Sequence, residues 1–298
     1  MQEPLIIRLP NWVGDVVMCL PALKLLQQLN IPIICIGRPW AKDLLFSLNI
    51  PVYFWPKKYF QAIKLLKNIP GKHMLLFTNS FSSALVAKLA GKKACGFATD
   101  GRSWLLNQAI KKPINQHETD LFNLLTKQCL QAWRPGLTLI DFDKYPALQI
   151  AKQDQEQLPN KYIVLCPFAH GTNPNGESKR WPYWQELATQ LTHLNPVICP
   201  GPNEITEAQA NFAQIQQITH LNLQEYLHIL NNAEFIIAND SGPMHMACAV
   251  GTPTIAIFGA TDEKRTGPRN AIIVGKAGNW PNTAMILHQI NILSTNYK

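Results

Sequence analysis

The feature that most constrains the fold is an alternation of short, wholly apolar runs with segments of helical periodicity. In the first half, strands are expected at 5–9, 33–37, 52–55, 74–78 and 94–97. A helix is expected to follow the first strand as far as about residue 29, with a kink at Pro21. Strands that are apolar on both faces and separated by helices are typical of a parallel sheet covered by helices on both sides. The pattern therefore predicts an α/β fold.

The alternation stops at a polar stretch, residues 141–160, which contains Pro146 and Pro159, and then starts again. Further strands are expected at 162–166, 197–199, 218–221, 235–238, 254–258 and 271–274, and a final helix at 283–293. This organisation predicts two doubly wound Rossmann-like domains, residues 1–155 and 156–298, facing across a cleft at the carboxyl ends of their strands. It also allows the C-terminal helix to pack back on the first domain.

The charge balance indicates an anionic partner. The 298 residues include 27 Lys and Arg against 19 Asp and Glu, a formal net charge of +8. Such a field attracts nucleotide diphosphates, phosphorylated lipids, anionic membranes or nucleic acid, and charge alone does not distinguish them. Nucleic acid ranks last, because the sequence has neither stripes of Lys and Arg nor a helix-turn-helix or RNA-binding signature.

Other composition features favour a cytoplasmic protein. No apolar run reaches the ~20 residues of a membrane-spanning helix, and the N-terminus does not resemble a signal peptide. The seven cysteines are scattered through mostly apolar segments without a C-x-x-C pair. They are expected to be buried free thiols in a reducing compartment rather than a disulfide framework or a zinc site.

The first candidate motif is the segment 8–15, in which a strand ends in a loop that opens a helix. Gly14 permits close approach of another backbone, and Asp15 lies near the helix N-terminus, where its charge is favoured. Asp15 is either an ordinary helix cap or a base that takes a proton from an acceptor hydroxyl.

The second motif, residues 178–182, follows the strand at 162–166. Lys179 and Arg180 stand before a helix whose first turn is expected to contain Pro182. They predict a phosphate clamp, and the alternative is a solvated basic pair.

The third motif, residues 239–245, follows the strand at 235–238. A strand, an acidic turn, glycine and then a helix with proline near its start make an anion-binding helix N-terminus. Asp240 could accept a hydrogen bond from a sugar hydroxyl, and Ser241 could supply a hydroxyl. His245 either reaches back to the ligand or satisfies a buried carbonyl.

These segments, with 20–23 and 258–268, resemble the ADP-heptose:lipopolysaccharide heptosyltransferases of glycosyltransferase family 9. The resemblance implies a GT-B architecture, with acceptor binding in the N-terminal domain and donor binding in the C-terminal domain. It also implies an inverting reaction that needs no metal cofactor. The nearest D-x-D sequence, residues 141–143, falls in the presumed linker.

By resemblance, Asp15 is the catalytic base and Lys179 the clamp on the donor diphosphate. The donor-binding residues are then Lys179, Arg180, Asp240, Ser241, Gly242, Pro243, Met244 and His245, and Pro243 stands where family members often carry leucine. The expected partners are an ADP-sugar and a phosphorylated glycolipid acceptor, with peripheral contact at the inner membrane.

Two alternatives stay open: another nucleotide sugar or acceptor, or a non-catalytic paralogue that binds nucleotide or glycan. The retained Asp15 and Lys179 argue against the paralogue, and transfer assays separate the two.

Overall fold

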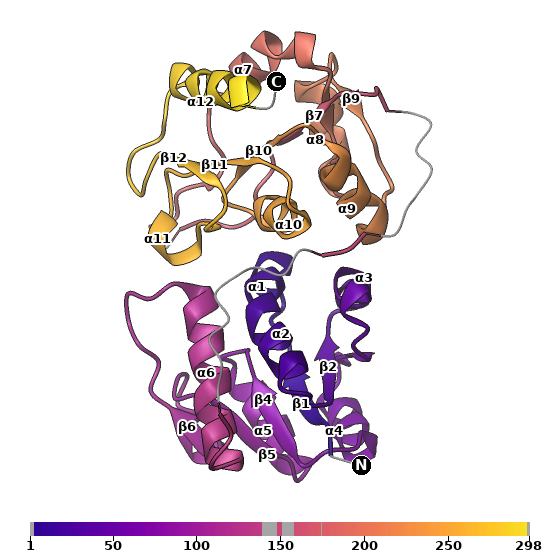
Figure 1. Cartoon of the computed structure of the whole chain (residues 1–298), viewed down its shortest axis with the longest axis vertical. Coiled ribbons are helices and arrows are strands. Elements are labelled where there is room, and N and C mark those ends of the chain that lie inside the picture. Colours follow the sequence, from indigo (N-terminus) through magenta and orange to yellow (C-terminus); the bar gives the residue numbers. More distant parts are fainter. Residues whose placement is uncertain (1–2, 139–147, 151–157, 174, 297–298) are drawn as a thin grey trace. The chain divides into compact units, whose positions relative to one another are not determined.

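The computed structural model describes residues 3–138, 148–150, 158–173 and 175–296. The chain divides into two compact units, Met1–Pro146 and Ala147–Lys298 (Figure 1). The domain boundary predicted at residues 155 and 156 lies outside the described residues, as does the D-x-D sequence at 141–143. Each unit contains a six-stranded parallel sheet with helices on both faces.

The first unit has the strand order β3-β2-β1-β4-β5-β6, and every neighbouring pair is parallel. Its strands are β1 (Leu5–Arg8), β2 (Ile33–Gly37), β3 (Val52–Phe54), β4 (His73–Leu76), β5 (Lys93–Phe97) and β6 (Gln108–Ile110). Because the strands are parallel, their carboxyl ends lie at one edge, here called the carboxyl edge. The strand order reverses between β1 and β4, so the topological switch point lies there.

The helices of the first unit form two layers. Its helical elements are α1 (Val13–Met18), α2 (Leu20–Gln28), α3 (Ala41–Leu44), η1 (Phe46–Leu48), α4 (Tyr59–Asn68), α5 (Phe81–Leu89), η2 (Ser103–Leu105) and α6 (Glu118–Trp133). Residues of α4 and α5 share one apolar cluster with the sheet, whereas α1, α2 and α6 contact one another in the other layer. The break at Cys19 puts Pro21 at the start of α2, which confirms the predicted interruption of this helix.

The second unit repeats the topology of the first, with the order β12-β11-β10-β7-β8-β9. Its strands are β7 (Ile163–Cys166), β8 (Pro196–Ile198), β9 (Gln216–Gln217), β10 (Ile236–Asn239), β11 (Thr254–Ile257) and β12 (Ile272–Val274). The order reverses between β7 and β10, and the loops that follow these two strands carry the second and third predicted motifs.

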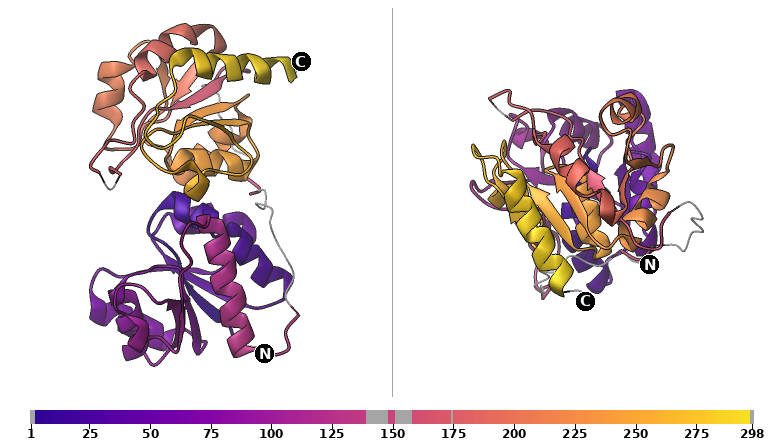
Figure 2. Two further views of the ribbon diagram at one scale, coloured as in Figure 1. Left: turned by 90° about the vertical axis from the view of Figure 1, so that its left-hand side faces the viewer. Right: turned by 90° about the horizontal axis from the view of Figure 1, so that it is seen from above.

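The second sheet is also covered on both faces. The helical elements are α7 (Trp184–Gln190), η3 (Thr192–Leu194), α8 (Ile205–Asn211), α9 (Leu223–Asn232), α10 (Gly242–Val250), α11 (Glu263–Thr266) and α12 (Thr283–Asn296). Residues of α7, α8 and α12 share one core cluster with the sheet. Helix α12 (yellow in Figure 2) contributes Ile286, Ile290 and Leu293 to that cluster.

Three local predictions need correction. The strand expected at 218–221 is wrong: β9 comprises Gln216–Gln217, and just beyond it the N–H of Ile218 bonds to the carbonyl of Ile198. Strand β6 was not expected, because Gln108–Ile110 is short and half-polar. Pro182 lies before α7 rather than in its first turn, since the helix begins at Trp184.

The expectation of seven free thiols is wrong for two cysteines. Cys95 on β5 and Cys129 on α6 form a disulfide, with Cα atoms 6.1 Å apart. Helix α6 packs on β5, so two fully buried side chains 34 residues apart in sequence meet in the core. The other five cysteines are free. Burial raises the pKa of the Cys166 thiol to about 12, which keeps it protonated at neutral pH.

None of the helices in the described part of the chain combines the length and apolar character needed to span a bilayer.

Candidate active site

An ion pair joins the second and third motifs at the carboxyl edge of the second sheet. The Nζ atom of Lys179 lies 3.0 Å from Oδ2 of Asp240, a carboxylate whose side chain is only 7% exposed. The hydroxyl of Thr261, in the loop after β11, donates to the same oxygen at 2.6 Å. Residues far apart in sequence therefore converge at the switch point, where doubly wound sheets bind their ligands.

Asn239, the last residue of β10, holds these segments together through the hydrogen bonds of its side chain. Its side-chain oxygen accepts from the backbone N–H of Trp181 and from Nε1 of Trp184, both at 3.0 Å. Its amide donates to the carbonyl of Pro167 at 2.7 Å. Asn239 is fully buried, so it ties the chain on either side of Lys179 to the strand that ends at Asp240.

Helix α10 begins at Gly242, two residues after Asp240, and its N-terminus has no side-chain cap. The N-cap residue Ser241 makes no side-chain cap, and its hydroxyl contacts the carbonyl of Asn239 instead, at 3.3 Å. Residues 241–243 are half-buried. The first N–H groups of a helix have no partner within the helix and carry its positive dipole end, so this segment can bind an anion. The side chains of Met244 and His245 are buried.

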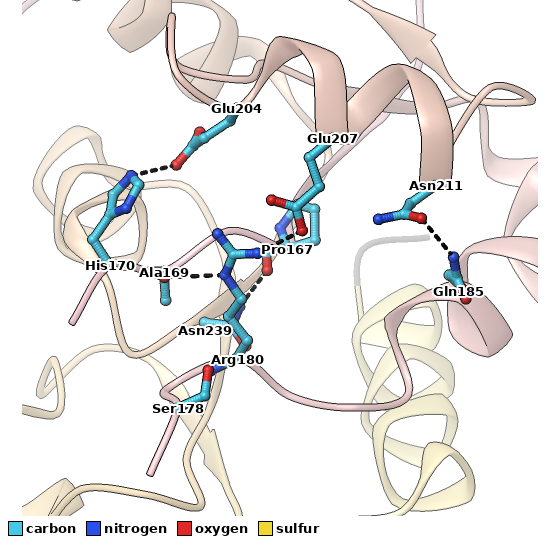
Figure 3. A network of polar contacts seen from close by, with 10 residues as sticks. All are labelled: Pro167, Ala169, His170, Ser178, Arg180, Gln185, Glu204, Glu207, Asn211 and Asn239. Atoms are coloured by element: carbon cyan, nitrogen blue, oxygen red, sulfur yellow. Dashed lines mark hydrogen bonds and ion pairs between the residues drawn. The ribbon is translucent and has the colours of Figure 1, made fainter. Parts of the chain in front are cut away.

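Arg180 points away from the Lys179–Asp240 pair. Its guanidinium donates to the carbonyl of Ala169 at 3.1 Å and pairs with Glu207 on α8 (Figure 3). The guanidinium also lies 5.7 Å from the ring centroid of Phe168. Arg180 therefore links the loop after β7 to α8, while Lys179 faces Asp240.

The segment between β7 and Lys179 forms a small hairpin, in which Thr172 bridges Ser178. The hairpin is held by Asn173, which is buried and whose amide donates to the carbonyl of Ala260 at 2.9 Å. Lys179 follows this hairpin directly, and Thr261 follows Ala260. The Asn173–Ala260 bond thus fixes two of the segments that surround Asp240.

In the first unit, Asp15 lies in the first turn of α1, close to the switch point between β1 and β4. The N-cap residue, Trp12, makes no side-chain cap, and Asp15 is half-buried. A carboxylate here is favoured by the helix dipole.

Arg8, the last residue of β1, orders the loop that leads to Asp15. Its Nη2 donates to Oδ1 of Asn11 at 2.8 Å, and Nη1 donates to the carbonyls of Leu9 and Ile36. Burial, and secondly the charge of Arg38, lower the pKa of Arg8 to about 10. The guanidinium therefore stays charged at neutral pH.

The structure brings together Lys179, Asp240 and the start of α10, as the motifs predict. The side chain of Arg180 instead contacts Ala169 and Glu207. Sequence reasoning assigned no role to Asn239, Thr261 or Asn173. Asn239 and Thr261 lie within two of the segments that resemble glycosyltransferase family 9, 239–245 and 258–268, and this position was the only sequence evidence for a role. Within the described ranges, no group of three or more His, Cys, Asp or Glu side chains could hold a metal ion.

Comparisons with known proteins show the family and the fold of this chain. A family model described as glycosyltransferase family 9 (heptosyltransferase) matches residues 62–285. Lipopolysaccharide heptosyltransferase 2 of Escherichia coli is 27% identical over 301 residues, covering 87% of this chain and 83% of that protein. Lipooligosaccharide heptosyltransferase 2 of Haemophilus influenzae is 25% identical over 308 residues, covering 87% and 84%. The solved E. coli ADP-heptose lipopolysaccharide heptosyltransferase II matches with a TM-score of 0.80 at 20% identity, over 99% of both chains. This likeness confirms the predicted α/β architecture.

Proposed function

The chain belongs to glycosyltransferase family 9, and on that premise we propose that it transfers heptose from ADP-heptose to an acceptor in the inner core of lipopolysaccharide. The choice of donor and acceptor is supported by the names of its relatives in E. coli and H. influenzae. The observation that carries the proposal is the Lys179–Asp240 pair beside the uncapped start of α10.

In the proposed donor site, Lys179 and the N–H groups at the start of α10 bind the diphosphate. Both supply positive charge where negative charge develops as the diphosphate leaves. Asp240, which also accepts a hydrogen bond from Thr261, already holds the lysine side chain in place, and this lowers the entropy lost when the donor binds. Arg180 supports this site by linking the loop after β7 to α8. Ser241–His245 form the surface of the site against which the diphosphate lies.

In the proposed inverting step, the acceptor hydroxyl attacks the anomeric carbon from the face opposite the diphosphate. Asp15 takes the hydroxyl proton as general base. The acceptor thus belongs to the first unit and the donor to the second, so transfer requires both units.

The reaction needs no metal cofactor, since Lys179 and the helix start supply the charge on the leaving group. The enzyme works in the cytoplasm, at the inner face of the membrane, and it takes no nucleic acid partner.

The deciding experiment incubates the protein with a panel of nucleotide sugars and truncated core glycolipids, and the products are detected by mass. A heptose adduct formed from ADP-heptose, at a rate unchanged by EDTA, is the expected result. Transfer from a different nucleotide sugar alone would refute the proposed donor, and loss of activity in EDTA would refute the metal-free step.

A further inference from the structure

A surface of the first unit, between β3 and the end of α4, combines exposed aromatic rings with unopposed positive charge. Residues 44–99 contain eight lysines and no aspartate or glutamate. Four of these lysines flank two aromatic residues at the start of α4, and all six side chains are exposed. This set, here called the α4 surface, comprises Lys57, Lys58, Tyr59, Phe60, Lys64 and Lys67.

The rings of the α4 surface do not belong to the core of the unit. Tyr59 and Phe60 are 63% and 64% exposed. The inner side of α4 is already packed, because Ala62 and Leu66 are fully buried in the cluster that faces the sheet. Phe60, Lys64 and Lys67 follow the spacing i, i+4, i+7, which places them on one outer side of the helix.

The charge at the start of α4 is unfavourable for the helix itself. Lys57 and Lys58 stand at the positive end of the helix dipole, and the first turn contains no acidic residue and no side-chain cap. The Nζ atom of Lys58 lies 6.0 Å from the centroid of the Phe60 ring. Anionic groups outside the protein would neutralise this charge, whereas a second copy of the chain would bring more lysines to it.

The α4 surface is linked to the loop that carries Asp15. Strand β3 ends at Phe54, so the following loop lies at the same carboxyl edge as the loop after β1. Trp55 in that loop packs over the guanidinium of Arg8, 4.5 Å from the ring centroid, and Arg8 in turn holds Asn11. The start of α4 and the loop that carries Asp15 therefore lie at the same edge of the sheet, while α4 itself packs on the face opposite α1.

From these observations we infer that the α4 surface binds an anionic phospholipid bilayer, with Tyr59 and Phe60 inserted at the headgroup level and the four lysines against lipid phosphates. Exposed aromatic rings next to lysines are the composition that partitions into a membrane interface. Salt screens the lysines but not the rings, so part of the binding persists at high salt. The inference rests on the proposed function for its purpose, which is to bring the enzyme to a membrane-anchored acceptor.

The test is sedimentation of the full-length protein with vesicles of neutral phosphatidylcholine, alone or with phosphatidylglycerol, at low and high salt. Neither donor nor acceptor is present, so the outcome does not depend on catalysis. The parent should bind the anionic vesicles and retain a fraction at ~1 M salt, where the Debye length is about 3 Å. The Y59S/F60S variant should lose the salt-resistant fraction, with partitioning weakened about tenfold or more. K64Q/K67Q should weaken binding mainly at low salt.

The matched control is M285S/I292S, which removes two exposed apolar side chains, 48% and 40% exposed, from α12, and it should bind like the parent. A fluorescent F60W variant should be quenched by brominated lipids more than the parent protein. Unchanged vesicle binding by Y59S/F60S would overturn the inference. So would sedimentation velocity showing that the parent forms a dimer which this variant loses, because the surface would then serve a second copy of the chain.

Discussion

At the scale of single residues, Asp15 is the sharpest test of the proposed chemistry. Asp15→Asn keeps the size of the side chain and removes its basicity. Transfer should fall by ~10²-fold or more, the usual contribution of a general base, while calorimetric affinity for ADP stays at the parent value. Asp43→Asn, in the first turn of α3, is the matched control and should transfer normally. If Asp15→Asn transferred sugar at the parental rate, Asp15 would not be the general base and would only interact favourably with the dipole of α1.

Lys179 should matter to both binding and turnover, because in the proposed donor site it contacts the diphosphate before and during its departure. For Lys179→Ala we expect a loss in kcat/KM equivalent to about 2–4 kcal/mol, the scale for one preorganised charged donor. Steady-state kinetics with ADP-heptose measures it. Lys161→Ala, which removes an exposed lysine paired with Glu234, should have no effect. If the two variants had equal kinetics, the ion pair of Lys179 with Asp240 would be structural only, and Lys179 would not bind the donor.

At the scale of elements, the hydrogen bonds of Asn239 predict a loss of stability when its side chain is removed. Asn239→Ala leaves the N–H of Trp181, the indole of Trp184 and the carbonyl of Pro167 without their partner. Each buried polar group left unpaired costs ~1–3 kcal/mol, so the free energy of unfolding of the second unit should fall by roughly 3 kcal/mol or more. Urea unfolding measures the change. The exposed Asn232→Ala on α9 is the control, and identical midpoints for both variants would contradict the role given to Asn239.

The elements also show what the sequence can predict. Buried strands such as β2 and β10 are evident because both faces are apolar, so the run of residues alone marks them. The edge strands β6 and β9 are short, β6 is partly polar and β9 consists of two glutamines, so their pairing depends on a neighbouring strand rather than on their own residues. The role of Asn239 could not be predicted from the sequence, because it depends on hydrogen bonds to Trp184 and Pro167, which are distant in sequence. The Cys95–Cys129 pairing depends in the same way on how α6 packs against β5.

At the scale of the whole molecule, the division into two units predicts that nucleotide binding survives separation. Both diphosphate-directed features, Lys179 and the start of α10, lie within Ala147–Lys298. This fragment should begin at residue 147, because Leu148 is buried and bonds through its N–H to the carbonyl of Ala249. It should bind ADP in calorimetry more weakly than the full chain and should not transfer sugar, since it lacks Asp15. A folded fragment without affinity, beside an N-terminal fragment that binds ADP, would reverse the assignment of donor and acceptor units.

The shared strand order has a consequence for how the chain folds during synthesis. In each unit the first strand, β1 or β7, becomes a central strand, and later strands are added outward, first on one side and then on the other. Every new strand thus pairs with one that the ribosome has already released, and only β4 and β10 must reach back past intervening strands. Because domains fold as units from the N-terminus during translation, the first unit can be complete before β7, the first strand of the second unit, leaves the exit tunnel.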